Sequence, residues 1–197
     1  MTDERTPSTG TDVERGEGAP ADLADIAADM AHASARFVSS VEAVAAAADP
    51  DAAISILLLE LSALLAAGAP LGALADVTPR DEYEPDAGAE PSLDRVRDAL
   101  RDMLGPADEY AEVFDPFSGP EVVTARLSDD LADVTADLLH GLAHHAAGRT
   151  LEALWWWQFS YLNNWGQAAS AAVRAIQSLM AHVRLEVPID VEAADPV

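Results

Sequence analysis

The chain has 197 residues, of which 35 are acidic and 11 are basic, so its formal net charge is −24. A sequence pI near 4.1 excludes an electrostatic binder of nucleic acid or anionic membranes, because such partners need a net basic surface. The absence of cysteine excludes disulfides and thiolate metal sites. Half of the residues are hydrophobic, which at this length predicts one domain with a substantial core.

Both ends of the chain are polar. Residues 1–21 offer almost nothing to bury and are predicted to form a disordered tail, as are residues 188–197, which leaves 22–187 as the domain. The first 20 residues have neither the basic start nor the apolar stretch of a signal peptide. We therefore expect a cytoplasmic protein.

Apolar residues recur every three or four positions over residues 22–48, which predicts the first long helix. Residues 51–67 form a second predicted helix that is apolar on most faces, as expected of a helix in the middle of a bundle. We expect the turn 68–70, which contains a proline, to end this helix. No membrane span is expected, because Glu60 interrupts the apolar run 52–75 and the break leaves it short.

The middle of the chain is predicted to hold a loop and shorter helices. Residues 76–91 are acidic and rich in proline and glycine, which favours a surface loop. Two short helical pieces are expected at 93–104 and 107–114. Ser128 is a natural N-cap for the next long helix, which Gly148 is expected to end.

The last predicted helix carries an apolar seam whose members are alternately four and three residues apart. The seam consists of Leu151, Trp155, Gln158, Leu162, Trp165, Ala169, Ala172, Ile176, Leu179 and Val183. Its phase is the same on both sides of Gly166, so we expect one continuous helix of about 33 residues. No segment alternates with period two over the length of a strand. The predicted fold is all-α, a bundle of four long helices with one or two short ones.

A polar stripe on the fourth of these helices is the first candidate site. Its members are spaced by three or four residues and share one helix face: Asp130, Asp133, Asp137, His140 and His144. Carboxylates and imidazoles one turn apart can hold a divalent metal. The alternative is a solvated face, because a chain this acidic contains about six Asp/Glu pairs at this spacing by chance.

A second candidate combines Glu109 and Glu112 with Asp130 and Asp133. These two pairs resemble the magnesium-binding helix pair of the all-α nucleotide pyrophosphohydrolases. The resemblance implies four carboxylates that hold Mg²⁺ for attack on a diphosphate. No basic residue near either pair is placed to bind phosphate.

The third candidate is a cluster of aromatic and amide side chains in the last helix: Trp155, Trp156, Trp157, Gln158, Asn164 and Trp165. Three consecutive helical residues fan over about 200°, so the three adjacent tryptophans cannot all enter one core. We expect Trp155 in the seam and Trp156 pointing away from it. Trp156 and Trp157 either pack between neighbouring helices or meet another chain. If they face inward, Gln158 and Asn164 need buried partners, for which Asp130, Asp133 or His140 are candidates.

Several runs in the second half of the chain resemble a bacterial all-helical family. They are Val113-Phe114-Asp115-Pro116, the run 127–134, and motifs within the tryptophan-containing stretch 153–166. The family is catalogued as domain-of-unknown-function family 5063, and the resemblance covers residues 22–184. It implies a single helical domain and no assigned activity.

The sequence departs from that family pattern at three positions. The pattern has an acidic residue where Trp156 stands, an arginine at Gln158 and a histidine at Asn164. If those residues formed a site with the aspartates, that site is blunted here, because glutamine carries no charge and asparagine does not shuttle protons at neutral pH. The departures weigh against an enzyme.

We therefore expect a binding or assembly protein without a cofactor that acts through its tryptophan-rich last helix, most simply as a homodimer. The alternative is a metal-dependent hydrolase that uses Mg²⁺ at the carboxylates named above. A third hypothesis places a small apolar ligand beside Trp155 and Trp165.

Overall fold

The computed structural model describes residues 20–47, 49–79, 87–88, 92–113, 117, 119 and 121–186. The predicted tails 1–21 and 188–197 lie almost entirely outside this part of the chain, as does most of the predicted loop 76–91. The described loop residues 76–79 and 87–88 belong to no helix or strand.

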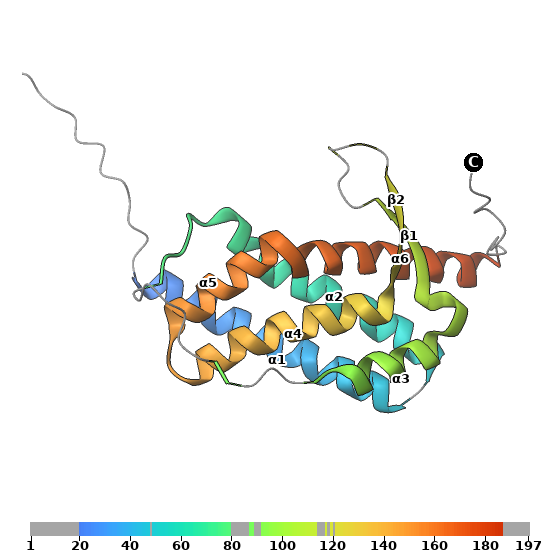
Figure 1. Cartoon of the computed structure of the whole chain (residues 1–197), viewed down its shortest axis with the longest axis horizontal. Coiled ribbons are helices and arrows are strands. Elements are labelled where there is room, and N and C mark those ends of the chain that lie inside the picture. Colours follow the sequence, from blue (N-terminus) through green and yellow to red (C-terminus); the bar gives the residue numbers. More distant parts are fainter. Residues whose placement is uncertain are drawn as a thin grey trace, which may run out of the picture.

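Helices dominate the described structure, which confirms the all-α class, although a small sheet is added to them (Figure 1). The elements in chain order are α1 (Pro20–Ala47), α2 (Pro50–Ala73), α3 (Asp94–Leu104), the 3₁₀ turn η1 (Gly105–Asp108), β1 (Glu109–Val113), β2 (Val122–Arg126), α4 (Leu127–Ala146), α5 (Thr150–Ser160), the π turn η2 (Tyr161–Trp165) and α6 (Gly166–Leu185).

The core lies between four helices. α1 packs against α2 and α4, and α6 packs against the same two helices, so the four surround a common interior. α5 packs mainly against α4, and α3 packs against α4 and α1. Figure 1 shows these helices along the long axis of the molecule, with the β-hairpin projecting beside α6.

The hairpin corrects two expectations, that residues 107–114 are helical and that the chain has no strand. β1 and β2 pair antiparallel, with Glu109 opposite Arg126 and Val113 opposite Val122. Within β1, Tyr110 and Glu112 are half-buried, while the residues on either side of them are exposed. Five residues of alternation are too short to identify a strand in sequence, and the pairing joins residues up to 17 positions apart.

α2 corrects two further expectations. It continues through Pro70 to Ala73, and the carbonyl of Ala66, which loses its amide donor at Pro70, lies on the exposed side of the helix. It is also not central, because only one face is buried and Leu59 on the other face is 69% exposed. Among the described helices, the α2 segment Ala52–Ala73 has the length and composition of a membrane span, a property that core helices of soluble proteins share.

The start of α4 is capped from outside the helix. Ser128, predicted as the N-cap, lies inside the first turn, since the helix begins at Leu127. The buried carboxylate of Asp108 accepts hydrogen bonds from the Ser128 backbone N–H and from the Ser128 hydroxyl, each at 2.8 Å. Asp108 thereby satisfies a helix-terminal amide that has no partner within the helix. The far end agrees with expectation, because Gly148 adopts a positive φ of 74° just beyond the helix.

α5, η2 and α6 follow one another without a break, but the π turn changes the phase of the buried face. Residues eight apart in an α-helix are rotated by about 80° from each other, and a π turn takes up an additional residue. Trp157 and Trp165 consequently both lie in the core, fully buried. Trp155 is only half-buried, and the predicted seam members Leu162 and Val183 are exposed.

Both buried indoles rely on glycine in a facing helix. A methyl group at Gly141 of α4 would overlap the indole of Trp157, and one at Gly68 of α2 would overlap that of Trp165. The Trp157 Nε1–H donates to the Leu138 carbonyl at 3.4 Å, and the Trp165 Nε1–H donates to the Trp157 carbonyl at 3.2 Å. Their polar edges are therefore satisfied inside the core.

The substitution Gly141→Ala is expected to lower the free energy of unfolding by about 1–3 kcal/mol, because the added methyl overpacks the indole. In an open helix the same change stabilises by about 1 kcal/mol, so the sign itself is diagnostic. The smaller ring in a Trp157→Phe background should relieve most of the penalty. Chemical denaturation of wild type, the two single variants and the double variant measures these changes in the free energy of unfolding. A Gly141→Ala protein as stable as wild type would contradict the packing described.

Candidate functional site

The polar stripe predicted on α4 is present, but its side chains do not converge on one point. Its three aspartates each bind a different side chain. Asp130 accepts a hydrogen bond from the Tyr110 hydroxyl at 2.6 Å, and Asp133 pairs with Arg97 at 3.1 Å. Asp137 accepts a hydrogen bond from the Asn164 amide at 2.8 Å. His144 is fully buried, and its ring lies edge-on to that of His140. In the described part of the chain, no three His, Asp or Glu side chains are grouped so that they could hold a metal ion.

The predicted pair of Glu109 and Glu112 lies on a strand and not on a helix, which overturns the resemblance to a magnesium-binding helix pair. Residues three apart on a strand point to opposite faces. Glu109 pairs with Arg126 across the hairpin at 2.8 Å, whereas Glu112 lies on the face that carries Tyr110. The two carboxylates therefore cannot act together.

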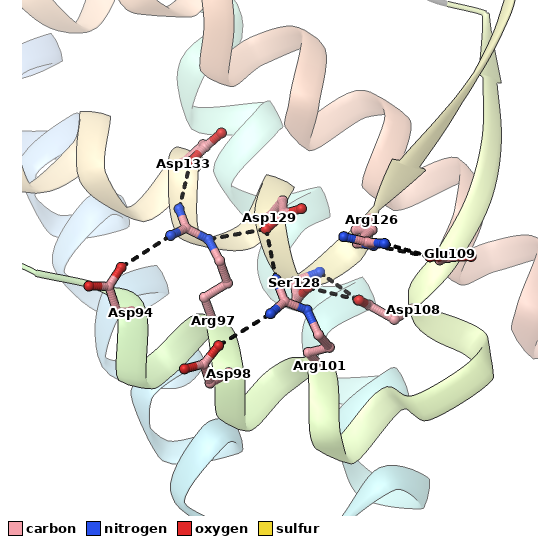
Figure 2. A network of polar contacts seen from close by, with 10 residues as sticks. All are labelled: Asp94, Arg97, Asp98, Arg101, Asp108, Glu109, Arg126, Ser128, Asp129 and Asp133. Carbon is pink, nitrogen blue, oxygen red and sulfur yellow. Dashed lines mark hydrogen bonds and ion pairs between the residues drawn. The ribbon is translucent and has the colours of Figure 1, made fainter.

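Ion pairs connect α3 to the first turns of α4 (Figure 2). Arg97 lies 3.1 Å from both Asp129 and Asp133, and Arg101 lies 3.3 Å from Asp129. The side chains are partly exposed, so each pair contributes little on its own, and the value of the cluster is that it holds α3 in place. Asp129 and Asp133 are thus neutralised where they stand.

Asp130 is the most perturbed carboxylate of the stripe. Burial raises its pKa to about 6, and the nearby carboxylates of Glu112 and Asp133 act in the same direction. The hydrogen bond from Tyr110 opposes this rise. Burial and the hydrogen bond to Asp130 in turn raise the pKa of Tyr110, so its hydroxyl stays protonated as the donor.

A second polar group lies where α4 meets the π turn. Burial raises the pKa of Asp137, while the hydrogen bond from Asn164 lowers it. The indole N–H of Trp156 donates to the Asp137 carbonyl at 3.0 Å, and its ring stacks on His140 with centroids 3.9 Å apart. Of the two alternatives expected for Trp156, packing against a neighbouring helix and contact with another chain, the contacts with α4 agree with the first.

Gln158 is buried and bonded to the end of α2. Its Oε1 accepts a hydrogen bond from the Val77 N–H at 2.7 Å, and its Nε2 donates to the carbonyls of Leu71 at 2.9 Å and Ala75 at 3.3 Å. The expected partners Asp130, Asp133 and His140 are therefore not used. Because Gln158 faces α2 while Trp156 and Asn164 face Asp137, the three departures from the family pattern do not belong to one site.

Of the six aromatic and amide candidates, Trp157, Gln158 and Trp165 are buried, and Trp156 and Asn164 are bonded to α4. The surface of α5 and of the π turn η2 instead carries three apolar side chains, Trp155, Phe159 and Leu162, here called the aromatic face. The rings of Trp155 and Phe159 stack with centroids 5.9 Å apart. Phe159 is 49% exposed and Leu162 is 59% exposed.

A cleft of about 820 Å³ lies between β1 and α6, here called the β1–α6 cleft. It is lined by Tyr110, Ala111, Glu112, Val113, Gln167, Ser170, Ala171, Arg174, Ala175 and Ser178. Sequence reasoning missed this cleft because it depends on the hairpin, and only Glu112 of its lining was singled out. The hydrogen bond between Tyr110 and Asp130 holds one wall of the cleft to α4.

The carboxyl group of Asp130 should titrate with a midpoint near 6 in ¹³C NMR, with its resonance assigned by its loss in Asp130→Asn. Since the folded pKa lies above the ordinary value of 3.8, the stabilisation from protonated Asp130 is complete below pH 3.8 and is lost as the pH rises through about 6. Asp130→Asn should therefore gain stability over wild type between about pH 4 and about pH 7.5.

The substitution Tyr110→Phe provides the directional check on this titration. It removes a donor that lowers the Asp130 pKa, so the midpoint should rise above that of wild type. A wild-type midpoint near the ordinary value, or a fall on Tyr110→Phe, would show that Asp130 is not in the environment described.

Comparison with known proteins supports the fold. The crystal structure of protein BF1032 from Bacteroides fragilis is similar with a TM-score of 0.63 at 19% sequence identity, covering 77% of this chain and 89% of that one. At this identity the likeness shows the fold alone. None of the curated proteins compared with the chain matches it.

The family resemblance inferred from the sequence is confirmed. The profile of the family described as Domain of unknown function (DUF5063) matches residues 21–182, which is most of the chain. The family covers the helices and the hairpin described above, including both walls of the β1–α6 cleft. The chain therefore belongs to the DUF5063 family.

Proposed function

We propose that this protein is a cytoplasmic binding and assembly module that pairs with a second copy of itself through the aromatic face of α5. The observation that carries the proposal is the exposure of Phe159 and Leu162 beside the half-buried Trp155. Exposed aromatic side chains in a group are typical of interface anchors. A closed pair is the commonest way for identical chains to cover such a face.

The charge distribution favours this face for self-association. Two copies that each carry a net charge of −24 repel each other over most of their surfaces. Residues 153–173, which include the aromatic face, contain no Asp, Glu, Lys, Arg or His. Contact here buries apolar area and brings no charged side chain of this segment into the interface.

The aromatic face is held rigid by the residues between its members. Trp156 is bonded to the Asp137 carbonyl of α4, and Gln158 is bonded to the end of α2. α5 is therefore fixed on two sides, so little conformational entropy is lost when a partner binds.

We take α1, α2, α4 and the run from α5 to α6 as the four long helices of the bundle that presents this surface.

The substitution Phe159→Glu should weaken self-association by at least about tenfold, because it places a charge in an apolar contact. Leu59→Glu is the matched control, since it adds the same charge at a more exposed apolar position on α2. Sedimentation velocity over a range of concentrations measures both. Wild-type association should also strengthen between about 0.05 M and about 0.5 M salt, because salt screens the repulsion between the two copies.

Two results would contradict this proposal. A wild-type protein that remains a monomer at every concentration and salt has no such interface. Dissociation by Leu59→Glu with no effect of Phe159→Glu would place the interface on α2.

A further inference from the structure

The β1–α6 cleft has two chemically different walls. The strand side presents Tyr110 and Glu112, which are half-buried because side chains two apart on a strand share a face. The helix side presents a polar row spaced by three or four residues: Gln167, Ser170, Arg174 and Ser178. The cleft thus has a carboxylate on one wall and a guanidinium on the other.

Arg174 is the arginine that lines the β1–α6 cleft. Arg97, Arg101 and Arg126 each pair with at least one carboxylate. Like Arg95 and Arg184, Arg174 forms no ion pair within the described residues, although the chain holds about three acidic residues for each arginine. Its guanidinium can therefore bind a carboxylate from outside in the two-bonded geometry that arginine favours.

Glu112 has the opposite character. Its carboxylate is close enough to raise the pKa values of both Tyr110 and Asp130. This wall therefore carries negative potential and favours a positively charged group such as an ammonium. It also disfavours a compact anion such as phosphate, which would meet the carboxylate of Glu112 with only one arginine to bind it.

We propose that the β1–α6 cleft binds a small zwitterion of the amino-acid or short-peptide class, with its carboxylate at Arg174 and its ammonium at Glu112. A molecule with only one of the two charges satisfies one wall and leaves the other charge without a partner. Ala171 and Ala175 supply apolar surface on the helix wall for an aliphatic side chain.

The size and rigidity of the cleft agree with such a ligand. A volume of about 820 Å³ lies within the range of small-molecule sites and gives room for a dipeptide or tripeptide. The hydrogen bond from Tyr110 to Asp130 fixes the strand wall before a ligand arrives. Ser170 already donates its hydroxyl proton to the Gly166 carbonyl at 2.7 Å, so its oxygen remains an acceptor for a ligand ammonium or amide.

The site is independent of the proposed self-association. None of its lining residues belongs to the aromatic face, and it lies on α6 and the hairpin, whereas that face lies on α5 and η2. Failure of either proposal therefore leaves the other to be tested separately.

The test uses the full chain and three probes: glycyl-leucine, N-acetylglycyl-leucine without the ammonium, and glycyl-leucinamide without the carboxylate. We expect saturable shifts in ¹⁵N NMR spectra for glycyl-leucine at residues of β1 and α6, with at least about tenfold weaker binding of both derivatives. Arg174→Gln and Glu112→Gln should each weaken the binding of glycyl-leucine by at least about tenfold. Arg184→Gln, in the exposed last turn of α6, is the control and should bind as wild type does.

The derivatives also assign each charge to its wall. Arg174→Gln should leave the already weak binding of glycyl-leucinamide unchanged, because that probe lacks the carboxylate that Arg174 binds. Far-UV circular dichroism and thermal melts of each variant show whether it is folded. Absence of saturable binding at about 10 mM glycyl-leucine overturns the proposal, as does equal binding by folded Arg174→Gln or tighter binding of inorganic phosphate.

Discussion

Two buried indoles, Trp157 and Trp165, set the arrangement of the helices around them. Each fits into a notch at a glycine of a facing helix, Gly141 of α4 and Gly68 of α2, where a single methyl group would overlap the ring. Eight residues separate the two indoles, so in an unbroken α-helix their side chains would be rotated by about 80° from each other. The π turn that lies between them reduces this rotation, and π turns of this kind are frequent at functional positions.

The consequences of this packing extend to both proposed binding surfaces. With Trp157 in the core, Gln158 reaches the end of α2 and Trp156 reaches the backbone of α4. The remaining face of α5 presents Trp155 and Phe159 toward solvent. Beyond the π turn, α6 turns its polar row toward the hairpin, and Arg174 has no ion-pair partner there among the described residues, unlike the arginines that bind α3 to α4.

Sequence patterns predicted what is local and missed what is not. Periodic apolar residues identified α1, and Gly148 identified the end of α4, because both signals lie within a few residues of the feature. The capping of Ser128 by Asp108 spans 20 residues, and the strand pairing that separates Glu109 from Glu112 is likewise non-local. The alternating spacing of four and three residues continues through the π turn, so the sequence gives no sign of it. The predicted seam therefore contained buried core residues together with Leu162, which is exposed. The candidate metal carboxylates shared a helix face as expected, but their partners come from other elements that no local pattern specifies.

The central claim is that the π turn places Trp157 in the core and leaves Trp155 toward solvent. The most direct measurement is ¹⁹F NMR of 5-fluorotryptophan-labelled protein with a soluble paramagnetic gadolinium chelate, in a Phe159→Glu background so that self-association does not shield α5. The account predicts that Trp157 and Trp165 keep sharp resonances, that Trp155 broadens most, and that Trp156 lies between because its ring is stacked on His140. Protection of Trp155 with broadening of Trp157 would mean that the helix runs in an unbroken α phase, and it would contradict the account.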